Sequence, residues 1–365
     1  MDFEVDRADL HRTRAVDDSP GALREDAVRL RIDSFALTSN NITYAVFGDA
    51  MQYWNFFPAS EAAPESRSWG RVPVWGFAEV VESRVAPLEP GRRVYGYWPM
   101  STELVVEAGR FDEGGFHDLA AHRRAMAGAY NRYSFTDTDP IYRPDREAHQ
   151  MVLWPLFFTS FLIDDFLADN DRFGASTVVV SSASSKTAIG AAFLLADRAG
   201  LRVVGLTSEG NADFVRNLGC YHDTVTYSDV ERLPDGDAVY VDIAGNLDVR
   251  AAVHAHYGDR LRYSMVVGGT HWDHEANVHA EGVGPKPVFF FAPSQIAKRT
   301  KEWGASTLDD RVGEAWGRYS AWVDGWIVFE RCNGPEQVEA AYRALLVARV
   351  DPRTGYVCSM RPSRA

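Results

Sequence analysis

Small and hydroxyl-bearing residues fill one short segment, SSASSKTAIG at residues 181–190, whose side chains are well suited to bind a phosphate. Serine hydroxyls and main-chain N–H groups donate hydrogen bonds to phosphate oxygens, and Lys186 adds a positive charge beside them. Gly190 is the one glycine in the segment, so side chains limit how closely the rest of this backbone can approach a ligand. Residues 184–187 also resemble the end of a phosphate-binding P-loop, but the two glycines that such a loop requires are missing. The segment predicts a pyrophosphate-binding turn of unusual composition.

The turn lies between a predicted strand and a predicted helix. Thr177–Val180 is a short apolar run, and the helix after the turn has an apolar face made of Ile189, Ala192, Phe193 and Ala196. A second apolar run, Leu201–Leu206, completes a parallel βαβ unit. Asp237–Ile243 and Tyr263–Val267 are further continuous apolar strands, as expected for a sheet covered on both faces. In such a unit the start of the first helix faces a phosphate.

Strand-like patterns also dominate the beginning of the chain. They predict strands at Ala27–Ile32, Val72–Val85, Arg93–Gly96 and Leu104–Glu107, followed by a helix over Asp118–Tyr133. The end of the chain returns to mixed character, with an amphipathic helix at Pro335–Val347 and a strand at Thr354–Met360. The simplest organisation is a cofactor domain inserted between two pieces of a catalytic domain, with boundaries at 1–152, 153–292 and 293–365.

Composition excludes several classes of partner. The 365 residues carry a net charge of −13, which disfavours nucleic acid and anionic membranes. The sequence shows no apolar run that is long enough to span a bilayer, and its first residues, MDFEVDRADLHRTR, lack the apolar core of a secretory signal. Cys220, Cys332 and Cys358 are scattered and form no disulfide framework. These features predict a cytoplasmic protein that acts on a small molecule.

The order of these motifs resembles one protein family. GRRVYGYWPMSTELVV, LTSEGNADFVRNLGCYHDTVTY and DAVYVDIAGN are similar to stretches of the medium-chain dehydrogenases/reductases, within the zinc-free quinone oxidoreductase and enone reductase branch. The similarity extends from Ala27 to Met360. It implies an α/β fold, in which a Rossmann-type doubly wound parallel sheet is inserted in a β-rich, GroES-like catalytic domain. It also implies a homodimer, formed through the apolar strand Val288–Phe291, because an unpaired apolar edge invites association.

The resemblance assigns a set of cofactor-binding residues. The strand after the turn ends in Thr207 and Ser208, where a carboxylate would favour NAD, so the hydroxyls favour the 2′-phosphate of NADPH. The alternative is that these two residues only begin the next helix as N-cap residues. The expected cofactor contacts are Thr159, Ser182, Ser184, Ser185, Lys186, Thr187, Ile189, Gly190, Thr207, Ser208, Asn211, Gly245, Gly268 and Gly269.

A metal is not expected. The Gly-His-Glu motif of the zinc-using branch is replaced by residues 75–79, WGFAE, and no cysteine precedes Cys220. His271, His274 and the nearby His279 have unconvincing spacing for metal ligands and are interpreted as hydrogen-bonding histidines.

The substrate site is expected near residues 38–53. Asn40 matches the family's asparagine at the nicotinamide pocket, and Tyr44 or Tyr53 offers a phenolic hydroxyl that can polarise a carbonyl. The alternative is that Asn40 and Asn41 form a turn and that both tyrosines are core residues. The segment from Arg110 to His149 is longer than the family pattern and is interpreted either as a lid over the substrate or as a surface or dimer contact.

These features together predict a zinc-independent, NADPH-dependent reductase of an enone or quinone-like substrate. Such hydride transfer needs orientation and stabilisation of developing negative charge on the carbonyl oxygen, which hydroxyl donors provide. The alternative is a non-redox protein that kept the fold, with a ligand-binding, regulatory, lyase or hydratase role. The serine-rich turn keeps that alternative open.

Overall fold

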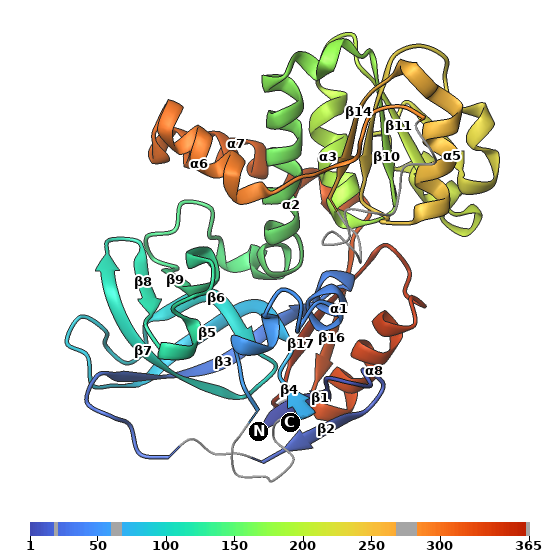
Figure 1. Ribbon diagram of the computed structural model, residues 1–365. Coiled ribbons are helices and arrows are strands. Elements are labelled where there is room, and N and C mark those ends of the chain that lie inside the picture. The colour runs from blue at the N-terminus through green and yellow to red at the C-terminus, as the bar shows by residue number, and fades with distance from the viewer. Residues whose placement is uncertain (18–20, 60–67, 268–282, 363–365) are drawn as a thin grey trace. The chain divides into compact units, whose positions relative to one another are not determined.

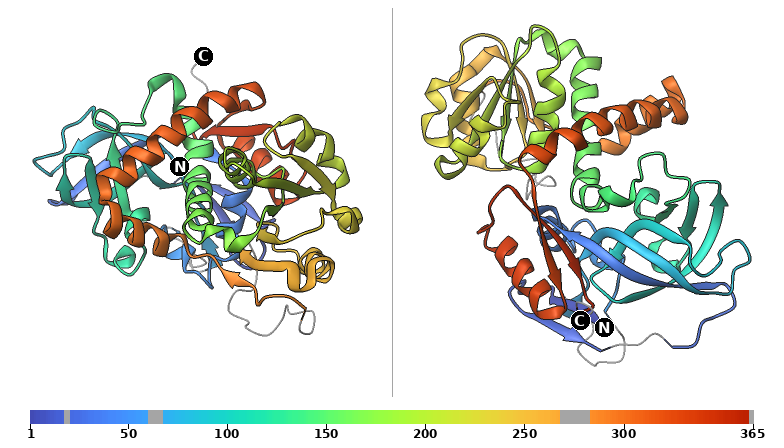
Figure 2. Two further views of the ribbon diagram at one scale, coloured as in Figure 1. Left: turned by 90° about the horizontal axis from the view of Figure 1, so that it is seen from above. Right: turned by 180° about the vertical axis from the view of Figure 1, so that it is seen from behind.

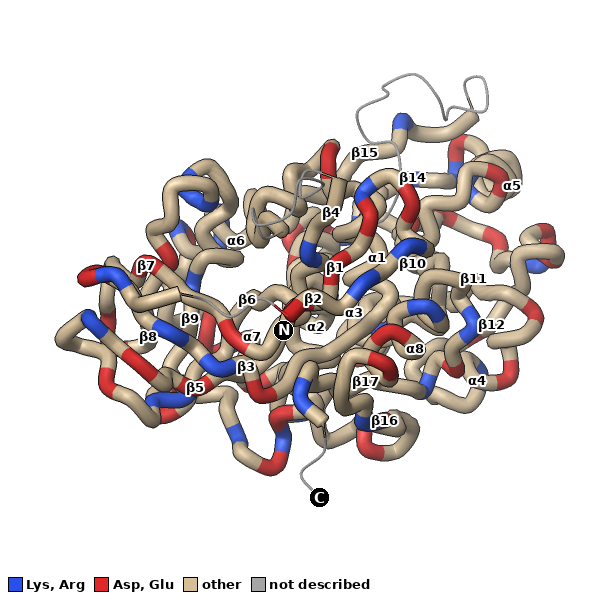
Figure 3. Tube along the Cα trace, turned by 90° about the horizontal axis from the view of Figure 1, so that it is seen from below, with Lys and Arg blue, Asp and Glu red and all other residues tan. Residues whose placement is uncertain are grey.

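The computed structural model describes residues 1–17, 21–59, 68–267 and 283–362 (Figure 1). The chain divides into two compact units. The first is Met1–Val152 together with Ile327–Ala365, and the second is Leu153–Trp326. Figure 3 shows Lys and Arg interspersed with Asp and Glu along both units.

The second unit is built on a parallel sheet of six strands in the order β12-β11-β10-β13-β14-β15. The first strand in the chain, β10, lies in the middle of the sheet. The next two strands, β11 and β12, are added on one side of it and the last three on the other, which is the Rossmann order. The predicted α/β class and the predicted parallel sheet are confirmed. The strands are β10 (Thr177–Ser181), β11 (Arg202–Thr207), β12 (Asp223–Thr226), β13 (Ala238–Asp242), β14 (Leu261–Val266) and β15 (Val288–Phe289).

Helices cover both faces of this sheet, because its central strands are apolar on both sides. Val179 and Tyr240 pack with Val253 and Tyr257 of α5 (Leu247–Tyr257) on one face. On the other face lie α2 (Glu147–Asp169) and α3 (Lys186–Ala196) (Figure 1). The short α4 (Ala212–Asn217) follows β11. The connections after β10 and β13 lead to opposite sides of the sheet, so the strand order reverses between these two neighbours, and such sheets bind ligands at this point.

One helix of the described residues, Pro144–Asp169, is long and apolar enough to cross a membrane by length and composition, so the expectation that no apolar run has this length is wrong. The most apolar 18-residue window of this helix is 61% buried within the protein.

Two helices that the sequence did not predict extend the second unit. These are α6 (Ala292–Trp303) and α7 (Ala305–Trp322), which follow one another in Figures 1 and 2. The ring of Tyr319 in α7 stacks 4.6 Å from Phe157 of α2, and Trp316 lies 5.5 Å from the same phenylalanine. This aromatic packing holds α7 to the second unit. The chain therefore returns to the first unit at Ile327, and not after residue 292 as the sequence predicted.

The first unit is dominated by an eight-stranded sheet in the order β16-β17-β3-β5-β6-β9-β8-β7. The long β3 also pairs with β7, so the strands from β3 to β7 form a closed ring. The strands are β3 (Ala27–Leu37), β5 (Pro73–Ser83), β6 (Arg93–Pro99), β7 (Glu103–Asp112), β8 (Gly115–Asp118), β9 (Arg132–Phe135), β16 (Val328–Asn333) and β17 (Thr354–Ser359). A smaller sheet joins β1 (Asp2–Asp6), β2 (Thr13–Val16) and β4 (Trp69–Gly70), and α8 (Pro335–Leu346) links β16 to β17.

The predicted helix over Asp118–Tyr133 is wrong. The segment consists of two short 3₁₀ turns, η3 (Ala121–Arg123) and η4 (Gly128–Asn131), between β8 and β9. The Arg123 side chain is 1% exposed and donates hydrogen bonds to Asp118 at 2.9 Å, to the Asn131 side chain at 3.0 Å and to the Tyr133 hydroxyl at 2.8 Å. A buried guanidinium needs several acceptors around it, and this requirement overrides the helix propensity of the alanine-rich sequence.

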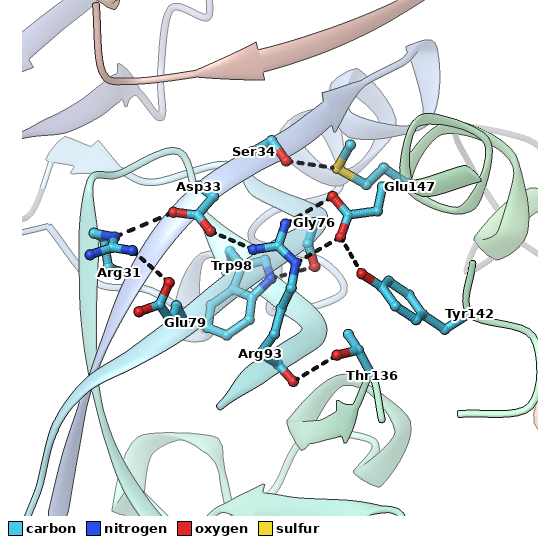
Figure 4. A network of polar contacts seen from close by, with 11 residues as sticks. Arg31, Asp33, Ser34, Gly76, Glu79, Arg93, Trp98, Thr136, Tyr142 and Glu147 are labelled. Carbon is cyan, nitrogen blue, oxygen red and sulfur yellow. Dashed lines mark hydrogen bonds and ion pairs between the residues drawn. The ribbon is translucent and has the colours of Figure 1, made fainter. Parts of the chain in front are cut away.

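A second polar network joins β3 and β6 to the start of α2 (Figure 4). The Arg93 guanidinium donates to Asp33 at 2.5 Å and to both carboxylate oxygens of Glu147, at 2.7 and 2.8 Å. The Tyr142 hydroxyl donates to Glu147 at 2.9 Å. This network fixes the first turn of α2, the helix that leads into the second unit.

Candidate functional site

The turn after β10 keeps a left-handed bend without a glycine. Ser182 has φ +53°, a conformation that glycine usually supplies. Its main-chain N–H donates to the Tyr227 hydroxyl at 3.1 Å, and its carbonyl accepts from the Ser185 N–H at 2.7 Å. The Tyr221 hydroxyl donates to the Ala183 carbonyl at 2.9 Å. Two tyrosines from the β12 region therefore fix the turn in place of the missing glycines.

The start of α3 provides further donors at this turn. Ser185 is the N-cap residue, and its hydroxyl accepts the Ala188 N–H at 3.3 Å. Asn211 donates to the Ser184 hydroxyl at 3.0 Å. Five predicted contact residues are partly exposed here: Ser182, Ser184, Ser185, Lys186 and Thr187. A helix N-terminus attracts anions, and Lys186 adds a charge of the right sign, so the arrangement fits a phosphate.

Three other predicted contact residues serve packing or make contacts within their own helix. Ile189 is fully buried and Gly190 is buried, and a Cβ atom on Gly190 would lie 2.7 Å from Ser160 Oγ. That hydroxyl donates to the Thr187 carbonyl at 2.8 Å and so joins α2 to the first turn of α3. Thr159, one residue earlier, donates to the Pro155 carbonyl at 3.4 Å and is half-buried. Gly190 thus allows the close contact between the two helices.

The end of β11 is only partly open to a ligand. The Thr207 residue is 1% exposed, whereas Ser208 and Glu209 are exposed. Ser208 occupies the N-cap position of the 3₁₀ turn η7 (Glu209–Asn211), without a capping hydrogen bond from its side chain. Glu209 accepts from the Ser228 hydroxyl at 3.1 Å. Ser208 is therefore the accessible residue of the pair predicted to contact the 2′-phosphate, and Asn211, another predicted cofactor contact, is half-buried.

A buried polar network that the sequence did not reveal joins the ends of β10 and β13. The Ser181 hydroxyl donates to Asp242 at 3.0 Å and accepts the N–H groups of residues 243 and 244, each at 3.0 Å. Asp242 also accepts the Gly245 N–H at 2.9 Å and pairs with Arg250 at 2.7 Å. Ser181 and Asp242 are the polar residues that end the apolar strands β10 and β13, and this pattern in the sequence could have identified the network. It fixes Gly245, a predicted contact residue, at the point where the strand order reverses.

Several predicted residues lie outside the described part of the chain. These are Gly268, Gly269 and the histidines His271, His274 and His279. Within the described residues, no group of three or more His, Cys, Asp or Glu side chains could hold a metal. The stretch that replaces the zinc motif is part of β5, where Glu79 pairs with Arg31 at 2.6 Å and the Gly76 carbonyl accepts from Trp98 at 2.9 Å (Figure 4).

The predicted catalytic residues come together in the first unit. Asn40 and Tyr44 lie on α1 (Ser39–Val46), and Tyr53 begins the 3₁₀ turn η1 (Tyr53–Asn55). The Tyr44 and Tyr53 rings are 4.6 Å apart, and the Asn40 side chain lies close enough to the Tyr44 hydroxyl to affect its pKa. Asn41 has a structural role, because it completes the capping box of α1 with Thr38. Tyr44 is also 6% exposed, so it has the burial that the core interpretation expected.

Three further aromatic residues complete what we call the tyrosine cluster: Trp75 of β5, Tyr97 of β6 and Tyr130 of η4. The Tyr97 ring lies 4.8 Å from Tyr130 and 5.7 Å from Tyr44. The Tyr130 ring lies 6.5 Å from the ring of Tyr44 and 6.2 Å from that of Tyr53. Tyr130 belongs to the long segment 110–149, which contains β8, η3, η4 and β9. The lid interpretation of that segment stays a prediction. No sequence spacing connects these positions, because they lie on separate strands and turns.

Burial keeps the phenols of the tyrosine cluster protonated. Loss of contact with water raises the pKa of Tyr44, Tyr97 and Tyr130, and raises the pKa of Tyr53 to about 12. At neutral pH all four hydroxyls are therefore hydrogen-bond donors.

These pKa shifts predict a loss of stability at high pH. Unfolded tyrosine ionises near its ordinary pKa of 10.0, below the raised pKa of the folded protein, so stability is full below pH 10 and falls as pH rises toward 12. We expect absorbance at 295 nm to report ionisation of the cluster only as the circular dichroism signal of the fold is lost. A Tyr53→Phe variant should unfold at higher pH. Ionisation of all tyrosines near pH 10 with the fold intact would contradict this.

Comparison with known proteins places the fold. A family model described as "Protein of unknown function (DUF2855)" matches residues 35–351. No curated protein matches the sequence. Among solved structures, CurA from Vibrio vulnificus in complex with NADPH is similar at TM-score 0.59 and 14% identity, covering 97% of this chain and 94% of that chain. YhdH of Escherichia coli K-12 with bound NADPH is similar at TM-score 0.55 and 13% identity, covering 99% and 100%. The Etr1p/NADP/crotonyl-CoA complex is similar at TM-score 0.54 and 13% identity, covering 98% of each chain. These similarities confirm the predicted fold.

Proposed function

The chain belongs to the family described as "Protein of unknown function (DUF2855)", and on the basis of its fold and its two groups of donors we propose that it is an NADPH-dependent oxidoreductase. The reaction we propose is hydride transfer to an activated C=C bond of an enone, or to a quinone-like substrate, without zinc. The observation that carries the proposal is the serine turn, with its helix N-terminus and Lys186, placed where the strand order of a Rossmann sheet reverses.

The second unit would hold the cofactor. Main-chain N–H groups at the start of α3, the hydroxyls of Ser182, Ser184 and Ser185, and the Lys186 ammonium supply donors and charge for a pyrophosphate. Ser208 and Asn211 offer uncharged donors for a 2′-phosphate. Bound NADPH or NADP in the similar CurA, YhdH and Etr1p structures supports this choice of cofactor.

The first unit would hold the substrate. Reduced nicotinamide supplies a hydride when it is bound, so the protein has to orient the acceptor and stabilise charge on its oxygen. Tyr44, supported by Asn40 and by Tyr53, is a neutral donor in a buried setting, where a hydrogen bond to a developing oxyanion is strong. We assign Tyr44 this role, with Asn40 and Tyr53 as its neighbours in the site.

A fluorescence titration tests the proposal. We expect NADPH to bind with saturation and to be oxidised when 3-penten-2-one or 1,4-benzoquinone is added, with NADH binding more weakly. The absence of NADPH and NADH binding at millimolar concentration would contradict it.

One observation favours the alternative function. The Ser182 N–H, which faces the turn, is already bonded to Tyr227 and is not available to a phosphate in this conformation. A non-redox protein that binds another ligand at the turn would show this arrangement together with a failure to bind either nicotinamide cofactor.

We further propose a cytoplasmic homodimer. β15 is an edge strand, and Val288, Phe289 and Phe291 are 43%, 40% and 55% exposed. Pairing of this edge with its copy would cover these side chains. A monomer in sedimentation at micromolar concentration would contradict the dimer.

A further inference from the structure

Two buried donors in the tyrosine cluster lack an acceptor. The Tyr97 residue is fully buried, and its hydroxyl makes no hydrogen bond of ordinary geometry with any described residue. The same holds for the indole N–H of Trp75, whose ring lies 5.0 Å from that of Tyr97. Leaving a buried donor unpaired is costly, and native proteins rarely do so without a reason. Both groups lie on neighbouring strands of the same sheet, β5 and β6.

The two donors lie beside the other hydroxyls of the cluster. The phenols of Tyr44, Tyr130 and Tyr53 all contribute to the raised pKa of Tyr97, and Trp75 lies 6.0 Å, ring to ring, from Tyr130. The hydroxyls of four chain segments therefore converge on one region. Tyr53, Trp75 and Tyr130 are only partly buried, so this region borders the outside of the protein core.

The hydroxyls of the cluster face neutral groups as well as one another. A buried charge beside the cluster, the Arg123 guanidinium that donates to the Tyr130 carbonyl at 2.6 Å, is paired with Asp118. The groups that shift the pKa values of Tyr44, Tyr53 and Tyr130 are other tyrosines, Trp75 and Asn40, together with burial. None of these groups could balance a charge on a bound ligand, and burying an unpaired charge is strongly unfavourable. The complementary ligand has an acceptor oxygen, carries no charge near it, and is flat enough to lie among aromatic rings.

We propose that the Tyr97 hydroxyl and the Trp75 indole N–H bind the carbonyl oxygen of an uncharged aromatic ketone or quinone-type compound, with its ring against the tyrosine cluster. This deepens the proposed function, on which it rests, because that oxygen is the one on which negative charge develops in the reduction. Tyr130 brings the segment 110–149 into the site, which would explain why this segment is longer than the family pattern.

Calorimetric titration with 1-indanone tests the site without requiring turnover. Indane, which has the same rings and lacks the carbonyl, is the matched control ligand. We expect 1-indanone to bind and Tyr97→Phe to weaken it about 10-fold, the loss of roughly one hydrogen bond, while leaving the weaker binding of indane unchanged. Because the hydroxyl has no partner in the free protein, the same variant should keep or raise the thermal midpoint. Trp75→Phe should act in the same direction on 1-indanone.

Tyr342→Phe is the control variant. Tyr342 is a fully buried tyrosine of α8 in the same unit, and its hydroxyl donates to the Leu10 carbonyl at 3.1 Å. It should lose stability and keep ligand affinity. Equal affinity of wild type and Tyr97→Phe for 1-indanone, a lower thermal midpoint for Tyr97→Phe, or no binding by wild type at millimolar concentration would each overturn the proposal. Ketone binding without NADPH binding would overturn the reductase function and leave this site standing.

Discussion

Substitution of Arg250 by alanine will lower the free energy of unfolding of the second unit by about 3–5 kcal/mol. The side chains of Arg250 and Asp242 are 8% and 0% exposed, and the pair is joined at 2.7 Å. Removal of the guanidinium leaves the carboxylate buried without its counter-charge, and that uncompensated charge is the source of the loss. Urea denaturation followed by circular dichroism measures the change.

The matched control is Arg262→Ala. Arg262 pairs with Asp237 at 2.9 Å in the same unit, but these side chains are 47% and 38% exposed, so the loss should stay below about 1 kcal/mol. Asp242 also holds the Gly245 N–H, so Arg250→Ala should weaken cofactor binding as well. Equal midpoints for the two variants would show that the buried pair does not stabilise the strand ends.

Reversal of charge at Lys186 will reduce NADPH affinity by about 100-fold. Lys186 is the first residue of α3 and is partly exposed beside the N-cap Ser185. Lys186→Glu replaces an attraction to a pyrophosphate by a repulsion of similar size, on a helix end that itself favours anions. Fluorescence titration of reduced nicotinamide measures the affinity, and the wild-type affinity should fall as salt is added.

Lys301→Glu provides the control for a change in net charge. Lys301 lies on α6 and is exposed, so this variant should bind NADPH as the wild type does. Both variants should keep their thermal midpoints, since neither side chain is buried. If Lys186→Glu binds NADPH with wild-type affinity, the serine turn is not the phosphate site.

Apolar runs predicted the parallel sheet well because local sequence determines them. The strand predicted at Thr177–Val180 is observed at Thr177–Ser181, and that at Asp237–Ile243 is observed at Ala238–Asp242. A strand that is covered on both faces is apolar throughout, so it can be recognised from its own sequence without knowing which strands lie beside it. The helices α6 and α7 were missed because polar residues dominate their exposed surfaces and because only the packing of Trp316 and Tyr319 assigns them to the second unit.

The candidate site was predictable in its position and not in its internal contacts. The turn itself and the pair Tyr44 and Tyr53 lie within short stretches of sequence. The tyrosine that fixes the turn, Tyr227, is 45 residues away from Ser182, and the orphaned Tyr97 is brought to Tyr44 only by the pairing of β5 with β6 and the packing of α1. Such long-range contacts leave no periodicity in the sequence.

The contact between Gly190 and Ser160 restricts how this chain can diverge. A methyl group at residue 190 would meet the Ser160 Oγ at 2.7 Å and its Cβ at 3.0 Å, so neither position can gain volume while the other stays as it is. A lineage that acquires alanine at 190 must first reduce residue 160 or let α2 move away from α3. Substitutions at residues 160 and 190 are therefore expected to occur together among descendants of this sequence, and the substitution that reduces residue 160 should come first.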